Sequence, residues 1–159
     1  MCNSRPIPTV FSCFALVLVS TVCVSASDSA LTQASKKTMS ADLEPFLKSY
    51  FATWSVGDIE GYRDHFHDRA SIATITEGIL TLSMSRDEFV AFQERALEGR
   101  TLTERMTSFT VDEDDVAAAV TAQWVLDDGT KKATGIDRFT LIRDRLGNWK
   151  IVSLLFYTR

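Results

Sequence analysis

A helix, a two-residue break and a second helix, centred near residue 55, constrain the fold of this chain more than any other feature. Gly57 is suited to end the first helix, and Asp58 is suited to cap the second. The second helix carries a narrow apolar face of Ile59, Tyr62 and Phe66. In the first helix apolar residues recur at helical spacing: Leu43, Phe46, Leu47, Tyr50, Phe51 and Trp54.

A short hairpin and a third helix are expected next. Residues 70–75 alternate weakly and are rich in β-branched side chains, and residues 79–82 follow Gly78 as a second short strand. Ser85 and Glu88 have the spacing of a capping box, which predicts that a third helix begins there. This helix is expected to stop at Gly99.

After Gly99 the hydrophobic period changes from helical to two. Turns rich in aspartate separate four long runs of alternating residues, which we expect to form an antiparallel meander. Strands that follow helices in this order favour an α+β domain with the helices packed on one face of the sheet. The predicted strands are Thr101–Val111, Val116–Leu126, Lys132–Arg143 and Trp149–Thr158.

The first 26 residues differ in character from the rest. Arg5 is their one charged residue, and small residues at Val24 and Ala26 suit a cleavage site, so residues 1–26 are interpreted as a secretory signal peptide. A membrane anchor, or lipid modification at Cys23, is the alternative. Residues 27–40 are expected to be a flexible leader and residues 41–159 the folded domain. After cleavage the protein would be exported to the periplasm or the medium, with no membrane attachment.

Composition excludes several classes of site. The three cysteines all lie in the predicted signal peptide, so we expect neither disulfides nor a thiol nucleophile in the domain. The formal net charge is −4 and the basic residues are scattered, which argues against a nucleic-acid partner. No glycine-rich phosphate or dinucleotide loop is present, and we predict no cofactor. His65 and His67 have the wrong spacing to share a helix face, and no metal site is predicted.

The chain resembles the nuclear-transport-factor-2-like (NTF2-like) superfamily, which includes SnoaL-like cyclases, ketosteroid isomerases and scytalone dehydratase. The resemblance covers residues 41–158. It rests on the Gly57-Asp58 break, on residues 66–72 before the first strand, and on residues 136–139 before Trp149-Lys150-Ile151. It implies a cystatin-like fold, a cone-shaped curved antiparallel sheet wrapped around three helices, with a mostly apolar pocket inside. It also implies a homodimer through the outer sheet face, where alternation places Gln123 and Arg138.

Asp137 is the sharpest local anomaly in the predicted sheet. It shares a strand face with Phe139, and if that face lines the cone, the carboxyl is desolvated and its pKa should rise. A hydrogen bond to the backbone or a pair with an arginine is the alternative. By resemblance, Asp137 and Tyr50 match the acid and the tyrosine of the isomerase oxyanion hole, in which a protonated aspartate donates a hydrogen bond. Tyr50 is otherwise a core residue.

The same resemblance fails at the catalytic base. The isomerases carry an aspartate on the first strand, and here Thr74 stands at about that position, where it cannot act as a base near neutral pH. His65 is the candidate replacement, with a partly exposed histidine at a helix end as the alternative.

Two functions therefore stay open. In one, the domain binds a small, mostly apolar organic ligand without catalysis; in the other, it is a lyase, isomerase or cyclase that moves a proton next to a carbonyl. The enzyme would use Tyr50 and Asp137 as oxyanion donors and His65 as base. The expected pocket residues are the same for both: Tyr50, Trp54, Thr74, Phe92, Trp124, Asp137 and Phe139.

Overall fold

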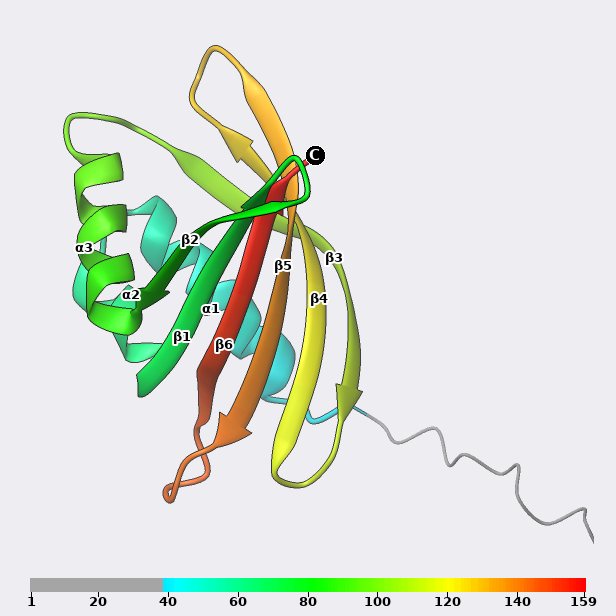
Figure 1. Cartoon of the computed structure of the whole chain (residues 1–159). Coiled ribbons are helices and arrows are strands. Elements are labelled where there is room, and N and C mark those ends of the chain that lie inside the picture. Colours follow the sequence, from blue (N-terminus) through cyan, green and yellow to red (C-terminus); the bar gives the residue numbers. More distant parts are fainter. Residues whose placement is uncertain (1–38) are drawn as a thin grey trace, which may run out of the picture. The chain divides into compact units, whose positions relative to one another are not determined.

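The computed structural model describes residues 39–159, which form three helices and one six-stranded sheet (Figure 1). The predicted signal peptide and the leader up to residue 38 lie outside the described residues. The elements are α1 (Leu43–Ser55), α2 (Ile59–Asp64), β1 (Phe66–Thr76), β2 (Ile79–Ser85), α3 (Arg86–Leu97), β3 (Thr103–Glu113), β4 (Ala117–Asp127), β5 (Lys132–Arg143) and β6 (Trp149–Thr158).

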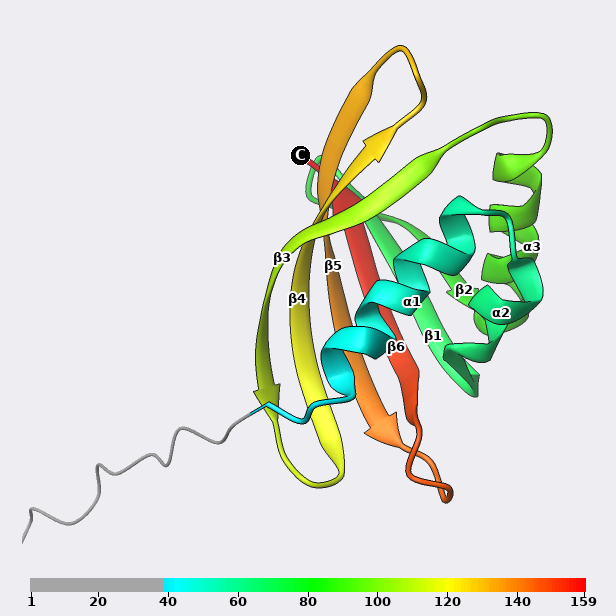
Figure 2. The ribbon, with the colours of Figure 1, turned by 180° about the vertical axis from the view of Figure 1, so that it is seen from behind.

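The strands lie in the order β2-β1-β6-β5-β4-β3. Strands β3 to β6 form the expected antiparallel meander, and β1 and β2 form the expected hairpin. One pairing departs from an all-antiparallel sheet, because β1 runs parallel to β6 in the middle of the sheet. The sheet is curved, and all three helices lie on one side of it (Figure 2). The α+β class and the cystatin-like architecture are confirmed.

The second helix is shorter than its apolar spacing predicts. It ends at Asp64, and Phe66 opens β1 rather than extending the helical face. The reason is a pairing with β6: Phe66 is opposite Ile151, and the Ile151 amide donates to the carbonyl of His65 at 2.8 Å. Phe66 is still buried, so its side chain joins the core from the sheet and not from a helix.

The core lies between α1 and the sheet. The apolar spacing of α1 buries one of its faces, including Leu43 and Leu47, which have no exposed surface. Helix α1 contacts β3, whereas α3 contacts β1 and β2, so the helices cover different parts of the same face. This division leaves room between α1, α3 and the sheet.

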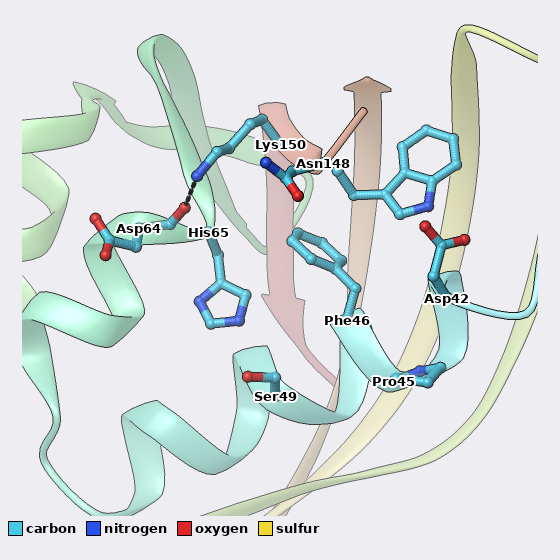
Figure 3. Close-up of a pocket in the computed structure, with 9 residues that line it drawn as sticks. Asp42, Pro45, Phe46, Ser49, Asp64, His65, Asn148 and Lys150 are labelled. Atoms are coloured by element: carbon cyan, nitrogen blue, oxygen red, sulfur yellow. Dashed lines mark hydrogen bonds between the residues drawn. The ribbon is translucent and has the colours of Figure 1, made fainter. Parts of the chain in front are cut away.

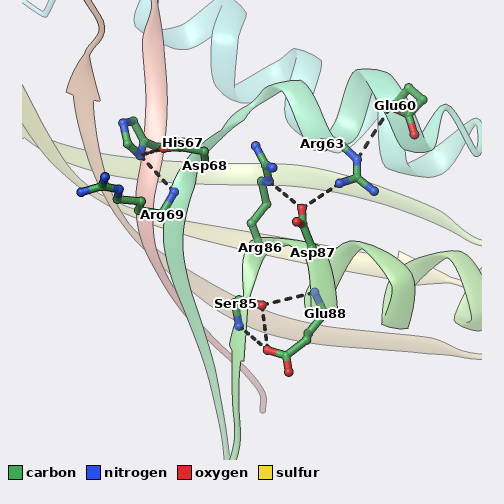
Figure 4. Close-up of polar contacts among 9 residues, drawn as sticks. All are labelled: Glu60, Arg63, His67, Asp68, Arg69, Ser85, Arg86, Asp87 and Glu88. Carbon is green, nitrogen blue, oxygen red and sulfur yellow. Dashed lines mark hydrogen bonds and ion pairs between the residues drawn. The ribbon is translucent and has the colours of Figure 1, made fainter.

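Side-chain caps fix where α2 and α3 begin, and Figure 4 shows the cap of α3. Asp58 accepts from the Gly61 amide at 3.0 Å, as the break predicts. Ser85 and Glu88 form the predicted capping box, with the Ser85 amide donating to the Glu88 carboxylate at 2.8 Å. Arg63 then joins α2 to α3 through an ion pair of 2.7 Å with Asp87. This ion pair links α2 and α3, which both contribute residues to the cavity described below.

Over the described part of the chain, no helix is both long and apolar enough to cross a membrane.

Candidate functional site

A cavity of about 200 Å³ lies between the helices and the sheet. All three helices and strands β3 to β6 contribute to it, and its walls are mainly aromatic rings. Its polar side chains include two carboxyl groups and one amide. The lining residues are Tyr50, Trp54, Tyr62, Phe89, Phe92, Gln93, Glu104, Trp124, Leu126, Asp137, Leu154, Phe156 and Thr158.

Asp137 is buried in this cavity, with 4% of its surface exposed. The indole Nε1 of Trp124, on the neighbouring strand, donates to its Oδ1 at 2.7 Å. Burial raises the pKa of Asp137 to about 7, although the hydrogen bonds from Trp124 and Tyr50 oppose that rise. The carboxyl therefore titrates near neutral pH instead of staying ionised as a surface aspartate does.

Gly135 is what lets Trp124 approach this carboxyl. The two residues face each other across β5 and β4. A Cβ atom at position 135 would overlap the Trp124 ring and the backbone oxygen of Tyr157. A side chain at this position would therefore displace the indole from Asp137.

Two tyrosine hydroxyls extend the hydrogen-bond chain. The Tyr62 hydroxyl donates to the Tyr50 hydroxyl at 2.9 Å, and Tyr50 in turn hydrogen-bonds to Asp137. Burial raises the pKa of both tyrosines well above their usual value, so both are neutral at physiological pH. The hydrogen bonds thus run from Tyr62 through Tyr50 to Asp137, and Asp137 also accepts the hydrogen bond from Trp124.

Glu104, on β3, is a second carboxyl group in the same cavity. Burial raises its pKa well above the usual value, and the nearby negative charge of Asp137 raises it further. Its backbone is fixed by Ser55 at the end of α1, whose hydroxyl accepts from the Glu104 amide at 2.8 Å. The site therefore contains two acids whose ionisation is mutually unfavourable.

The aromatic walls are held by their own contacts. Trp54 donates from Nε1 to the buried amide oxygen of Gln93 at 3.0 Å, which ties α1 to α3. The Tyr50 ring packs edge-on against Phe139, with their centroids 5.2 Å apart. These contacts hold the rings in place without any ligand.

The structure brings most of the expected pocket residues together. Tyr50, Trp54, Phe92, Trp124 and Asp137 all line the cavity. They come from four different elements, α1, α3, β4 and β5, so the cavity forms only when the helices have packed on the sheet.

Phe139 and Thr74 do not line this cavity. Phe139 is buried on the same strand face as Asp137, but the Tyr50 ring covers it. Thr74 is on β1, beyond β6 in the strand order, and its neighbour Phe156 on β6 lines the cavity instead. The expected places of both residues are corrected accordingly.

His65 lies outside the cavity that contains Asp137, which corrects its expected role as base there. It lines a separate groove of about 410 Å³ between α1 and the start of β6, beside Phe46 (Figure 3). The residue is buried, not partly exposed, and its Nδ1 lies 2.8 Å from the Gly61 carbonyl oxygen. Burial lowers its pKa, so the imidazole is neutral near pH 7 and is hydrogen-bonded to the helix end.

Neither Glu104 nor Tyr62 is identified as a site residue by the sequence alone. Glu104 shares a strand face with Met106 by simple alternation, so a carboxylate on an otherwise apolar face is the signal that could have found it. Tyr62 fits the apolar face of α2, and its hydroxyl partner depends on how α1 and α2 pack. Across residues 39–159, no three His, Cys, Asp or Glu side chains are grouped so that they could hold a metal ion.

A family model described as "Putative lumazine-binding" matches residues 38–157. The chain belongs to this family. The match spans almost all of the described residues, including both acids of the cavity. A search of curated proteins found no match.

Solved structures share the fold. An NTF-2-like protein of unknown function from Silicibacter pomeroyi is 27% identical, with a TM-score of 0.58 over 75% of this chain and 94% of that one. A protein of unknown function from Mycobacterium tuberculosis has a TM-score of 0.63 at 16% identity, over 73% and 69% of the two chains. A protein described as "Putative Scytalone Dehydratase" from Novosphingobium aromaticivorans has a TM-score of 0.59 at 13% identity, over 73% and 80%. These likenesses establish the NTF2-like fold.

Proposed function

We propose that the domain binds a small, mostly apolar organic molecule in the cavity, with the polar end of the ligand at Asp137. One observation carries this proposal: a partly open, aromatic-walled cavity in which Asp137 and Glu104 are the two acidic groups. Ligand sites have this composition, with apolar walls and a few convergent polar groups. The volume of about 200 Å³ is below the ~300–1,000 Å³ usual for drug-sized ligands, so the ligand is smaller than those.

The description of the family points in the same direction. It names lumazine, a flat heterocycle, and aromatic walls suit a flat molecule because rings stack on one another. We take this as support for a compact ring-containing ligand.

The test is a ligand-detected NMR screen of small ring compounds against the mature domain, with binders quantified by calorimetry. Leu126→Trp fills the cavity from β4 and should abolish binding. Leu146→Trp adds the same ring to a side chain that is 86% exposed in the β5–β6 turn, and should leave binding unchanged. Equal loss in both variants, or no binder in the screen, would contradict the proposal.

The second candidate function is acid–base catalysis by a lyase, isomerase or cyclase acting next to a carbonyl. The observation that favours it is Asp137 itself, whose pKa of about 7 suits proton transfer at neutral pH, beside Tyr50 as a second donor. Glu104 would take the role of base, since His65 lies in another groove. The test is deuterium exchange next to the carbonyl of small ketones in D₂O. Exchange no faster than in Glu104→Gln would reject catalysis.

Two properties of the whole protein complete the proposal. We propose export through cleavage of residues 1–26, which mass spectrometry of the mature N-terminus would test. We also propose a homodimer through the outer sheet face, where Gln123 and Arg138 are exposed. Sedimentation at micromolar concentration should give a dimer, and Thr140→Arg on that face should weaken it. Thr130→Arg in the β4–β5 turn is the control.

A further inference from the structure

The two acids of the cavity have unequal hydrogen bonding. Asp137 accepts from Trp124 and Tyr50, whereas the Glu104 carboxyl makes no hydrogen bond or ion pair among residues 39–159. The Glu104 side chain is half-buried and faces the cavity, so its carboxyl has no protein partner there and loses part of its contact with water. Glu104 is therefore the group with most to gain from a ligand.

The cavity has no positive charge of its own. None of its lining residues is a lysine, arginine or histidine. The hydrogen-bond chain from Tyr62 and Tyr50, together with the Trp124 bond, points toward Asp137. Donors that converge on a carboxyl favour its ionised form. When both acids are ionised, the cavity presents two negative charges and no lining cation to balance them.

The walls suit a cation as well. Trp54, Trp124, Tyr50 and Tyr62 surround the acids, and the face of an aromatic ring attracts a positive charge, most strongly for tryptophan. A neutral carbonyl ligand would use the rings as apolar surface alone and could not pair with ionised carboxyls. A ligand with an ammonium group would use both the rings and the carboxyls.

We propose that the ligand carries a protonated amine, which Glu104 and Asp137 bind as carboxylates inside the aromatic walls. This inference rests on the proposed function and specifies its ligand class as small organic amines. It assigns to Glu104 the charge recognition, and to Asp137, fixed by Trp124, the orientation of the amine.

Binding should be linked to pH. The titratable groups facing the cavity are Tyr50 from α1, Tyr62 from α2, Glu104 from β3 and Asp137 from β5; α3, β4 and β6 contribute none to the lining. The tyrosines stay neutral, so the two acids set the dependence. An ammonium ion favours ionised carboxyls, and affinity should therefore rise as pH increases through about 7.

The experiment compares benzylamine with benzyl alcohol, which has the same ring and nearly the same size, by calorimetry. At about pH 7.5 benzylamine should bind at least roughly tenfold more tightly, and this preference should shrink by about pH 5. Glu104→Gln should weaken benzylamine by about tenfold and leave benzyl alcohol unchanged. Glu94→Gln, an exposed glutamate on α3, is the matched control.

The outcomes separate this inference from the proposed function. If benzyl alcohol binds as tightly as benzylamine, and Leu126→Trp abolishes both, the amine class is rejected and the binding cavity stands. Benzylamine binding that survives in Leu126→Trp overturns the inference, because the amine is then elsewhere. If neither probe binds, the amine class is rejected, and the NMR screen of ring compounds decides the proposed function independently.

Discussion

The indole of Trp124 and the carboxyl of Asp137 are joined by a buried hydrogen bond of 2.7 Å between neighbouring strands. The bond holds the acid in place and favours its ionised form, which offsets part of the cost of burial. The pKa of Asp137 depends on the balance between burial, which raises it, and these hydrogen bonds, which lower it. Single substitutions can change each contribution separately.

Trp124→Phe should raise the pKa of Asp137 above its value of about 7. The phenyl ring keeps most of the apolar wall but has no N–H donor, so the ionised carboxyl loses stabilisation. A carboxyl ¹³C NMR titration measures the shift. Trp54→Phe removes the other cavity indole, which bonds to Gln93, and should leave the Asp137 titration where it is. An unchanged pKa in Trp124→Phe would show that the bond is not what lowers it.

Asp137→Asn should change how stability depends on pH. In the folded protein the pKa of Asp137 is about 7, whereas the unfolded value is near 3.8, so the unfolded chain ionises first. The stability contribution of Asp137 is complete below about pH 4 and is lost as pH rises through 7. The variant should gain up to about 4 kcal/mol relative to wild type between pH 4 and 8, at ~1.36 kcal/mol per pKa unit.

Urea unfolding of wild type and Asp137→Asn at about pH 4 and about pH 8 measures this gain in stability. Some pH dependence will remain, because burial also raises the pKa of Glu104. Asp112→Asn replaces an exposed aspartate on β3 and should stay within about 0.5 kcal/mol of wild type at both values. A constant difference between Asp137→Asn and wild type would mean that the buried acid is not titrating in this range.

Gly135→Ala should destabilise the domain by about 1–3 kcal/mol, although alanine favours strand structure more than glycine does. The added methyl group would overlap the Trp124 ring and the Tyr157 carbonyl oxygen, so one of them must move. Thermal unfolding measures the loss, and the NMR titration should show Asp137 behaving as in Trp124→Phe. Thr134→Ala, at the adjacent exposed position, is the control. Wild-type stability in Gly135→Ala would contradict the close approach.

Ser85→Ala should cost about 0.5–2 kcal/mol of stability through loss of the capping box at the start of α3. The Ser85 hydroxyl donates to the Glu88 carboxylate at 2.7 Å and accepts from the Glu88 amide. Alanine removes both of these hydrogen bonds. Ser83→Ala, on the exposed part of β2, is matched in size and should be close to neutral. Equal effects in denaturant unfolding would show that the cap contributes nothing.

Local signals in the sequence are sufficient for the elements and for part of the site. Gly57, Asp58 and the Ser85–Glu88 box act within a few residues of themselves, so their positions can be read directly. The burial of Asp137 follows from period-two alternation with Phe139, which needs no knowledge of packing.

Features that depend on distant packing are missed or misplaced by such signals. Phe66 fits a helical face equally well, and its place in β1 is set by pairing with β6, some 85 residues away. His65 is a plausible base from its closeness to Tyr62 in the chain, yet the end of α2 turns its ring into a different groove. Glu104 enters the cavity because α1, α3 and the sheet leave room beside it, which no local pattern reveals.

The parallel pairing of β1 with β6 has a consequence for the order of folding. Strand β6 separates the β1–β2 hairpin from β5, β4 and β3, so these two parts of the sheet have no direct strand contact until β6 is in place. A chain emerging from the ribosome therefore cannot close its cavity before the last ten residues of this sheet, Trp149–Thr158, are available. Such late, long-range closure is slow to form, and a nascent chain must remain free of aggregation until synthesis has passed Thr158.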